Sequence, residues 1–250
     1  MIYFFLKIKN LFRYSKFHFF ILKYKNPSYI DWIHKEIEFH KKFLIRDNLI
    51  FDLGANLGDK AHIFTFFTKN IVLYEPEENL ANILRLRFKK YKTIIVNESL
   101  VTDQIGIINF YSITGQEAYS SILLNYKKNF DHLKNNEIVL KKKNSTNLVA
   151  EIKKYGLPFY IKVDCEGAEE LILKNLDYRI RIISFEANLP KFLGNTLNVM
   201  EHFDNKFNSL FNLRRNNQFN FIFKTNTNFD EIKNFLLFEK DTFEVFVFND

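Results

Sequence analysis

The spacing of hydrophobic and polar residues predicts strands and helices that alternate along most of the chain. Short apolar runs predict strands at residues 49–53, 71–74, 93–96, 106–111, 137–140, 159–163, 180–185, 219–223 and 243–248. Apolar residues at helical spacing predict helices at residues 29–46, 60–69, 77–91, 147–155, 167–174 and 198–210, and a polar insertion spans 119–136. Strands that alternate with helices are typical of a mainly parallel sheet covered on both faces. Because no repeat or Pro/Gly-rich linker interrupts the pattern, we expect one α/β domain at 47–250 after a helical extension at 1–46.

The first part of that extension is basic and aromatic. Residues 1–26 contain Lys and Arg, no acidic residue and many bulky apolar side chains. The uncharged stretches are too short to cross a bilayer, and no small-residue cleavage site indicates a secretory signal. Two interpretations stay open: a helix lying on an anionic membrane face, or a helix that packs its aromatic face on the domain.

Composition limits the compartment and the partners. The chain has 250 residues, a formal net charge of +7 and a single cysteine, Cys165, so it has no internal disulfide framework. A reducing cytoplasm fits best, with or without attachment to the inner face of the membrane. The positive charge is compatible with nucleic acid, an anionic membrane face or an anionic small substrate.

Candidate chemistry follows the ends of the predicted strands, where parallel sheets bind ligands. After Asp52, the first turn reads Gly54-Ala55-Asn56 and then Gly58, with asparagine where a dinucleotide-binding turn has its second glycine. A side chain there would crowd a pyrophosphate, which disfavours NAD and suits S-adenosylmethionine. Glu75 follows the second strand at the spacing of a ribose-binding carboxylate, and Pro76 fixes the start of the next helix.

A second acidic cluster follows the strand at 159–163. Asp164 and Glu166 flank Cys165, and such carboxylates can orient a cofactor amino group, bind a metal or take a proton from a hydroxyl. No third ligand is evident, so we predict no metal site, although Mg²⁺ is compatible with these carboxylates. Cys165 reads as a small packed residue, because no histidine lies near it in the sequence.

Five segments, in this order and spacing, resemble the FkbM family of S-adenosylmethionine-dependent methyltransferases. They are FDLGANLG, YEPEENL, VNESLVTDQIG, IKVDCEGAEELIL and SFEANLP, and the resemblance covers about residues 45–190. It implies a Rossmann-like class I methyltransferase fold, with a mostly parallel twisted sheet, helices on both faces and a late antiparallel strand. It also implies methyl transfer to an oxygen, often on sugars, glycans or secondary metabolites.

The resemblance also implies roles for individual residues. It places the methionine portion of the cofactor at Asp52 and the turn Gly54, Ala55, Asn56 and Gly58, and the ribose at Glu75, next to Pro76. It places Asn97, Glu98 or Ser99 near the adenine and Asp164 near the cofactor amino group or methyl. Ser120 and Ser121 match a serine-containing segment of the family.

The chain departs from the family pattern after the strand at 180–185. Many members read Glu-x-His there, whereas this chain reads Glu186-Ala187-Asn188, and asparagine cannot take a proton. A general base must then be Asp164, Glu166 or Glu186, unless the reaction uses none. Ala61 also replaces a Ser or Thr that many members carry after the last glycine of the turn.

Two alternatives come from other functional classes. An RNA methyltransferase would explain the basic charge, but the sequence Asp164-Cys165-Glu166-Gly167 lacks the Asp/Asn-Pro-Pro-aromatic motif that stacks a flipped base, and its acidic groups disfavour a phosphate backbone. A non-catalytic scaffold for membrane-associated glycan assembly is the second alternative. The main expectation is a small-molecule or glycan hydroxyl as acceptor, with nucleic acid disfavoured.

Overall fold

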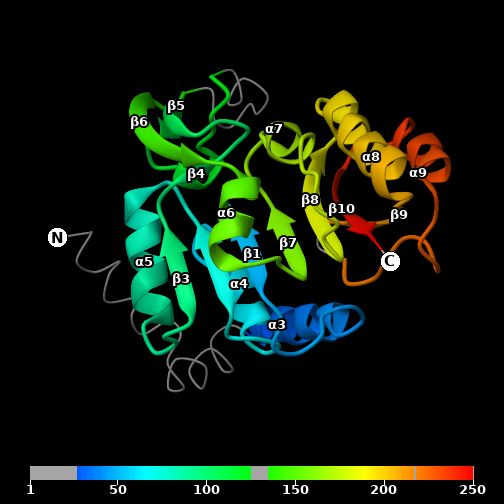
Figure 1. Ribbon diagram of the computed structural model, residues 1–250, viewed down its shortest axis with the longest axis horizontal. Helices are drawn as coiled ribbons and strands as arrows, with labels where there is room; N and C mark the ends of the chain where they lie inside the picture. The colour runs from blue at the N-terminus through cyan, green and yellow to red at the C-terminus, as the bar shows by residue number, and fades with distance from the viewer. Residues whose placement is uncertain (1–26, 125–134, 217, 250) are drawn as a thin grey trace.

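The central element is a seven-stranded, mostly parallel sheet (Figure 1). The computed structural model describes residues 27–124, 135–216 and 218–249, so the predicted basic segment at 1–26 lies outside the described residues. The strands are β1 (Ile50–Leu53), β2 (Ile71–Tyr74), β3 (Ile94–Asn97), β7 (Tyr160–Val163), β8 (Ile182–Asn188), β9 (Leu210–Arg215) and β10 (Thr242–Phe248). Their order is β3-β2-β1-β7-β8-β10-β9, and β10 is antiparallel to both of its neighbours. This arrangement confirms the Rossmann-like class I methyltransferase fold.

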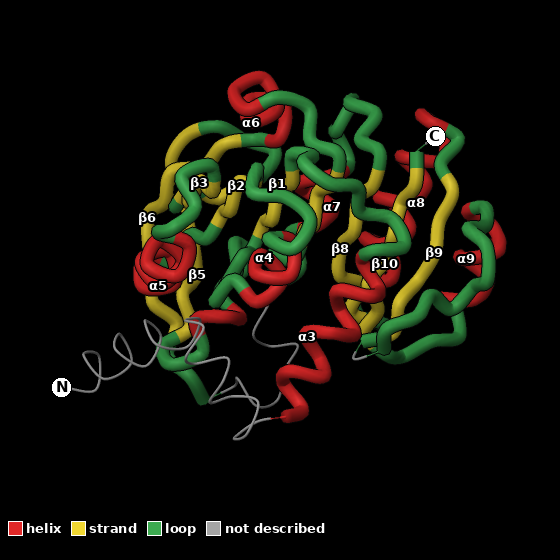
Figure 2. Tube along the Cα trace, turned by 90° about the horizontal axis from the view of Figure 1, so that it is seen from below, coloured by secondary structure: helices red, strands yellow, loops and turns green. Residues whose placement is uncertain are grey.

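Helices cover the sheet on both faces because strand side chains alternate between two hydrophobic cores. Ile50 packs with α3 (Pro27–His40), α4 (Asp59–Phe64) and α5 (Glu78–Phe88). Phe51 and Leu53 pack with α6 (Leu148–Tyr155), α7 (Glu169–Leu173), α8 (Leu193–Phe207) and α9 (Phe229–Leu236). Figure 2 shows α3, α4 and α5 along one side of the strands and α6 on the opposite side. Among the described residues, none of the helices combines the length and apolarity that a membrane span requires.

A smaller sheet replaces the helix that would otherwise follow β3. It has the order β4-β6-β5 and consists of β4 (Leu100–Val101), β5 (Gly106–Ile113) and β6 (Ile138–Thr146), with the 3₁₀ helix η1 (Glu117–Tyr119) after β5. In Figure 1 this sheet lies at the end of the molecule where α7 lies. It therefore stands over the strand ends that carry the candidate chemistry.

The prediction for residues 198–223 is wrong in two respects. The helix begins at Leu193 and ends at Phe207, because Asn208 adopts a left-handed conformation (φ 53°) that stops a helix. This leaves residues 210–215 free to form β9, the edge strand that the sequence did not predict.

The predicted strand at 219–223 is absent, because the side chain of Asn212 accepts from the Phe223 N–H and donates to its carbonyl. The ring of Phe221 instead packs 4.9 Å from Phe39 and 5.1 Å from Phe246.

Other differences concern lengths. The strand predicted at 137–140 runs from Ile138 to Thr146, because residues 138–145 pair continuously with β5. The helices predicted at 29–46, 60–69 and 167–174 are shorter, and α9 at Phe229–Leu236 was not predicted.

Candidate active site

The turn after β1 brings two strand ends into contact. Gly54 has a φ of +75°, and a Cβ placed on it would lie 1.8 Å from the backbone oxygen of Asp164. Only glycine therefore lets the end of β1 pack directly against the end of β7. Gly58, the last glycine of the turn, has a different neighbour: its added Cβ would lie 2.6 Å from Cδ2 of Leu84 on α5. Gly58 thus packs α4 against α5 and does not line the cavity described below.

Glu75 is fixed by the backbone of two turns. Its Oε2 accepts from the N–H of Asn56 at 2.8 Å, and its Oε1 accepts from the N–H of Glu77 at 2.9 Å. The residue is 5 % exposed, and this burial raises the pKa of its carboxyl to about 7. Each oxygen keeps a further lone pair, so the carboxylate can accept two more hydrogen bonds from a ligand in front of it.

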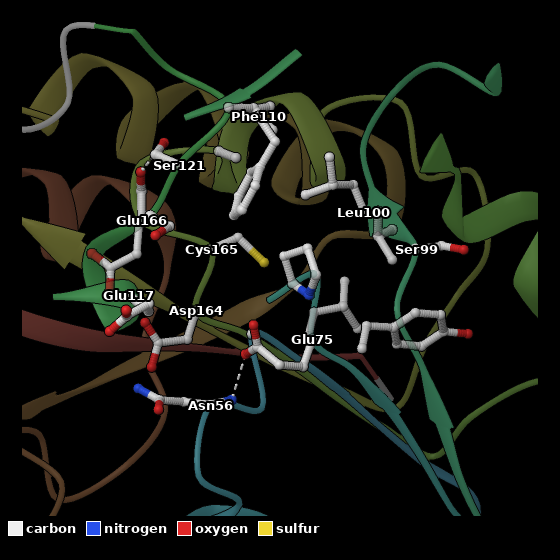
Figure 3. Close-up of a pocket in the computed structure, with 18 residues that line it drawn as sticks. Asn56, Glu75, Ser99, Leu100, Phe110, Glu117, Ser121, Asp164, Cys165 and Glu166 are labelled. Atoms are coloured by element: carbon white, nitrogen blue, oxygen red, sulfur yellow. Dashed lines mark hydrogen bonds between the residues drawn. The ribbon is translucent and has the colours of Figure 1, made fainter. Parts of the chain in front are cut away.

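A central cavity opens between these turns and the smaller sheet (Figure 3). Figure 3 shows Asn56, Glu75 and Asp164 on one side and Phe110 of β5 opposite them. The charged side chains that line it are all acidic: Glu75, Glu117, Asp164 and Glu166. The remaining lining residues are Leu53, Gly54, Asn56, Tyr74, Pro76, Ser99, Leu100, Val101, Phe110, Ser120, Ser121, Ile122, Cys165 and Ala168. Its charge favours a cationic ligand.

The three candidates after β3 occupy different places. Ser99 lines the central cavity. Asn97 does not, and its side-chain amide lies 3.4 Å from the hydroxyl of Tyr155. Glu98 also lies outside and forms a half-exposed ion pair with Arg85 at 2.5 Å. Of this group, only Ser99 is in reach of a ligand in the cavity.

Asp52 is buried without a hydrogen-bond partner. It is 0 % exposed, neither carboxylate oxygen accepts a hydrogen bond, and the nearest ion-pair contact is Lys162 Nζ, 4.0 Å from Oδ1. Burial raises the pKa of this carboxyl to about 6. Asp52 lines a narrow passage together with Gly54, Ala55, Asn56, Leu57, Asp59, Lys60, Lys162 and Asp164. A buried acceptor without a donor is unfavourable by about 1–3 kcal/mol, so a donor on a ligand would find a ready partner here.

A side hollow lies on the other side of Asp164. It is lined by Trp32, Glu36, Lys60, Lys162, Val163, Asp164, Glu186, Arg214, Asn216, Thr242, Phe243 and Glu244. Asp164 is common to the central cavity, the passage and the side hollow. Lys162 Nζ donates to Asp164 Oδ2 at 2.8 Å. Burial alone would lower the pKa of Lys162, but the charges of Asp164 and Asp52 raise it. The Lys162 ammonium therefore stays protonated.

The three base candidates do not face the same space. Glu186 lines the side hollow, and its Oε2 accepts from Nδ2 of Asn188 at 2.6 Å. Burial and the charge of Asp164 raise the pKa of Glu186 to about 8. Glu166 lines the central cavity only, on a residue with a φ of 52°. Asp164 and Glu186 are therefore the two carboxylates that meet at the side hollow.

The neighbouring Cys165 and Glu169 have structural roles. Oε1 of Glu169 accepts from the N–H of Cys165 at 2.9 Å and of Gly167 at 3.4 Å, which holds the turn before α7. Burial raises the pKa of the Cys165 thiol, so it stays protonated, as expected of a packed residue. In the described part of the chain, no three or more His, Cys, Asp or Glu side chains are grouped in a way that could hold a metal ion.

Several lining residues were not found from the sequence. Phe110 and Glu117 come from the smaller sheet and η1, and Ser120 and Ser121, which the resemblance did indicate, lie beside them. Trp32 and Arg214 come from α3 and β9, far from the strand-end motifs. A basic pair at the end of an apolar run, Arg214-Arg215, was the only signal for the second group.

No protein-family model matches the chain, and no curated protein matches it. Among solved structures, precorrin-6y C5,15-methyltransferase from Geobacter metallireducens GS-15 superposes with a TM-score of 0.46 at 10 % identity, covering 86 % of this chain and 88 % of that one. An rRNA methylase from Streptococcus thermophilus gives 0.41 at 11 % identity over 87 % and 95 % of the chains. The 23S rRNA methyltransferase ErmE gives 0.44 at 11 % identity over 87 % and 68 %. At these identities the similarity concerns the fold alone.

Proposed function

We propose that the protein is an S-adenosylmethionine-dependent methyltransferase that methylates a hydroxyl group of a sugar, a glycan or a secondary metabolite. One observation carries the proposal: at the carboxyl ends of β1 and β7, an acid-lined cavity adjoins the passage lined by Asp52, a buried carboxylate without a hydrogen-bond partner. S-adenosylmethionine offers an ammonium, a sulfonium and a ribose diol. Each has a counterpart in this site.

The residues present fit that cofactor. The carboxylate of Glu75, already oriented by two backbone N–H groups, would accept from the ribose hydroxyls. Asp52 would accept from the ammonium of the methionine portion, which would supply the donor that the folded chain lacks. Ser99, Leu100 and Phe110 would surround the adenine, and Asp164 would lie beside the sulfonium methyl.

The same contacts disfavour a dinucleotide. In dinucleotide-binding folds, the turn N–H groups and the helix end face a pyrophosphate. Here the N–H of Asn56 is donated to Glu75, and the acidic Asp59 begins α4. A pyrophosphate would meet carboxylates where it needs donors.

The acceptor would enter through the side hollow, and its hydroxyl would meet the cofactor methyl beside Asp164. When bound, the cofactor supplies an electrophilic methyl on a sulfonium that leaves as a neutral thioether. A carboxylate of the protein would accept the proton of the acceptor hydroxyl as that oxygen takes up the methyl group. Most of the rate enhancement would then come from alignment and exclusion of water, with general-base assistance of about 10²- to 10⁴-fold.

Glu186 is our choice for that base, with Asp164 as the residue that aligns the hydroxyl. The Asp164 carboxylate is tied to the Lys162 ammonium at 2.8 Å. Glu186 faces the same hollow and is oriented by Asn188, and its raised pKa of about 8 makes it a stronger proton acceptor when ionised. Asn188 thus stands where the FkbM pattern has histidine and orients the base. From the five segments named above, and from the position of Asn188, we propose that the chain is a divergent relative of the FkbM family.

Calorimetry tests the cofactor. We expect S-adenosylmethionine to bind, S-adenosylhomocysteine to bind without the sulfonium contribution, and NAD to give no heat. Binding of NAD, or no binding of S-adenosylmethionine, contradicts the proposal.

Transfer of labelled methyl groups tests the acceptor class. The protein is incubated with methyl-labelled S-adenosylmethionine and an extract from cells that lack the gene, and the extract is separated into polysaccharide, small molecules and RNA. Label in the first two fractions supports the proposal. Label that ribonuclease removes supports the RNA alternative, and cofactor binding without transfer to any fraction supports the scaffold.

A further inference from the structure

Three cations line the side hollow, but they do not make it an anion-binding site. Lys60 Nζ lies 2.6 Å from Glu36 Oε1, and Lys162 Nζ lies 2.8 Å from Asp164 Oδ2. Arg214 forms a two-pronged ion pair with Glu36 at 3.0 and 3.1 Å and a second pair with Glu244. Because each of these cations already has a carboxylate partner, a phosphate or carboxylate on the ligand would have to compete with an internal anion.

The hollow also has an apolar wall. Two aromatic side chains line it, but Phe243 is only 1 % exposed, whereas Trp32 is partly exposed. Trp32 is held in place by Tyr29, stacked at 5.7 Å, and by Lys60, whose ammonium lies 5.6 Å from the centre of its ring. These contacts fix the orientation of Trp32, and the part of its ring that they leave exposed is the apolar surface that a ligand in the hollow can cover.

Polar groups stand near that wall. Glu186 and Asn216 line the hollow, and both carry side chains that accept hydrogen bonds from hydroxyls. An apolar wall beside oriented acceptors, with the cations neutralised, matches an uncharged ring that carries hydroxyls on its edge and C–H groups on its face.

We propose that the side hollow binds the methyl acceptor as an uncharged, polyhydroxylated ring, and that Trp32 of α3 is the residue that selects it by covering the apolar face of the ring. This inference rests on the proposed function, and it adds the site, its charge preference and the selecting residue. It gives α3 a role in substrate choice. Acidic sugars and phosphorylated acceptors are excluded by the paired cations.

The chain contains a single tryptophan, so its emission reports on this hollow alone. We expect the methyl glycosides of glucose, galactose or mannose to shift the emission in a saturable way at millimolar concentration. The matched anionic probe is methyl glucuronoside, which differs from methyl glucoside in one group. It should bind at least tenfold more weakly. The inference is overturned if none of the neutral glycosides changes the emission, or if the glucuronoside binds equally well.

Variants then test Trp32 by calorimetry with the neutral glycoside of largest effect, in the presence of S-adenosylhomocysteine. We expect Trp32→Ala to weaken glycoside binding at least tenfold and Trp32→Phe to retain most of it. Phe238→Ala, which changes an aromatic residue that is 87 % exposed and outside the hollow, should have no effect. Affinity for S-adenosylmethionine should stay within twofold in all three variants.

These measurements separate the two proposals. If S-adenosylmethionine binds but the glycosides do not, only the assignment of the hollow fails. If S-adenosylmethionine does not bind, the proposed function fails, whatever the glycosides do. Unchanged glycoside affinity in Trp32→Ala refutes the role of Trp32, and a parallel loss of cofactor affinity shows that the residue is structural. Thermal unfolding of each variant verifies that it is folded.

Discussion

The central cavity and the side hollow meet at Asp164, yet they differ in whether the charged side chains of their linings are paired with opposite charges. The central cavity has four carboxylates and no cation in its lining, and the adjoining Asp52 has no hydrogen-bond donor. In the side hollow, Lys60, Lys162 and Arg214 are each matched by a carboxylate, and the fourth carboxylate, Glu186, is held by the amide of Asn188. An unbalanced site gains stability when a ligand brings the missing charge, whereas a balanced site gains nothing from a charged ligand. This difference is the basis of our proposal that the central cavity binds a cationic cofactor and the side hollow a neutral acceptor.

The strongest test of the balanced site is removal of one of its cations. Arg214, with 7 % of its side chain exposed, holds both Glu36 and Glu244. We expect Arg214→Met to lower the free energy of unfolding by about 3–5 kcal/mol, because it leaves the buried Glu244 without its cation and Glu36 with Lys60 alone. Chemical denaturation measures the loss.

The neighbouring Arg215 is the matched control. It pairs with Glu239 and Asp241, but 34 % of its side chain is exposed, so Arg215→Met should cost less than about 1 kcal/mol. A loss in Arg214→Met as small as that in Arg215→Met would mean that the cations of the hollow are not structural. These cations would then be available to an anionic acceptor.

In the unbalanced site, the largest expected effect is at Glu75. Glu75→Gln replaces an oxygen that accepts from a backbone N–H by an amide donor and removes the charge that faces the ribose. Charge-assisted hydrogen bonds contribute about 1.5–3 kcal/mol each, so we expect S-adenosylmethionine to bind about 100-fold more weakly in calorimetry.

Glu98→Gln provides the control for Glu75. Glu98 also follows a strand end, but it lies outside the cavity and pairs with Arg85. Its substitution should leave the cofactor affinity unchanged. A loss as large as that of Glu75→Gln would move the ribose site towards β3.

These two glutamates show how much of the site the sequence could predict. Glu75 was predictable because the contacts of its carboxylate are local: the turn after β1 and the start of α5 both lie within 19 residues. The sheet was predictable for the same reason, since each strand of the first half carries its own apolar run and its own turn. Glu98 follows a strand in the same way, and only its pairing with Arg85 turns it away from the cavity.

The side hollow was not predictable because its contacts join distant parts of the chain. Glu36 and Arg214 are separated by 178 residues, and no local pattern marks their pairing. The strand that carries Arg214 was itself missed, because the left-handed turn at Asn208 depends on one residue. The smaller sheet, which supplies Phe110 and Glu117, lies outside the alternation of strands and helices on which the sequence argument rested.

Two glycines test whether the unbalanced site depends on close backbone packing. Gly54 and Gly115 both have a positive φ, +75° and +74°, but an added Cβ meets the Asp164 backbone only at Gly54 and meets nothing within 4 Å at Gly115. Gly115→Ala should cost about 1–2 kcal/mol for the backbone alone. Gly54→Ala should cost about 2 kcal/mol more because of overpacking. Denaturation measures both, and equal costs would show that the ends of β1 and β7 can separate freely.

Asp52 gives the smallest effect in stability and the most direct test of the comparison. Its folded pKa of about 6 lies above the usual aspartate value, so its contribution to stability is present at low pH and is lost as the pH rises through 6. A shift of about two pKa units corresponds to about 3 kcal/mol, and the buried amide that replaces it retains part of that cost. We expect Asp52→Asn to stabilise the ligand-free protein by about 1 kcal/mol at pH 8 and by almost nothing at pH 5.

The same variant should bind S-adenosylmethionine about tenfold more weakly at pH 8, because the ammonium loses its charged acceptor. If Asp52→Asn instead destabilises the protein at pH 8, Asp52 serves mainly as the partner of Lys162, and the charge of the central cavity is structural like that of the side hollow.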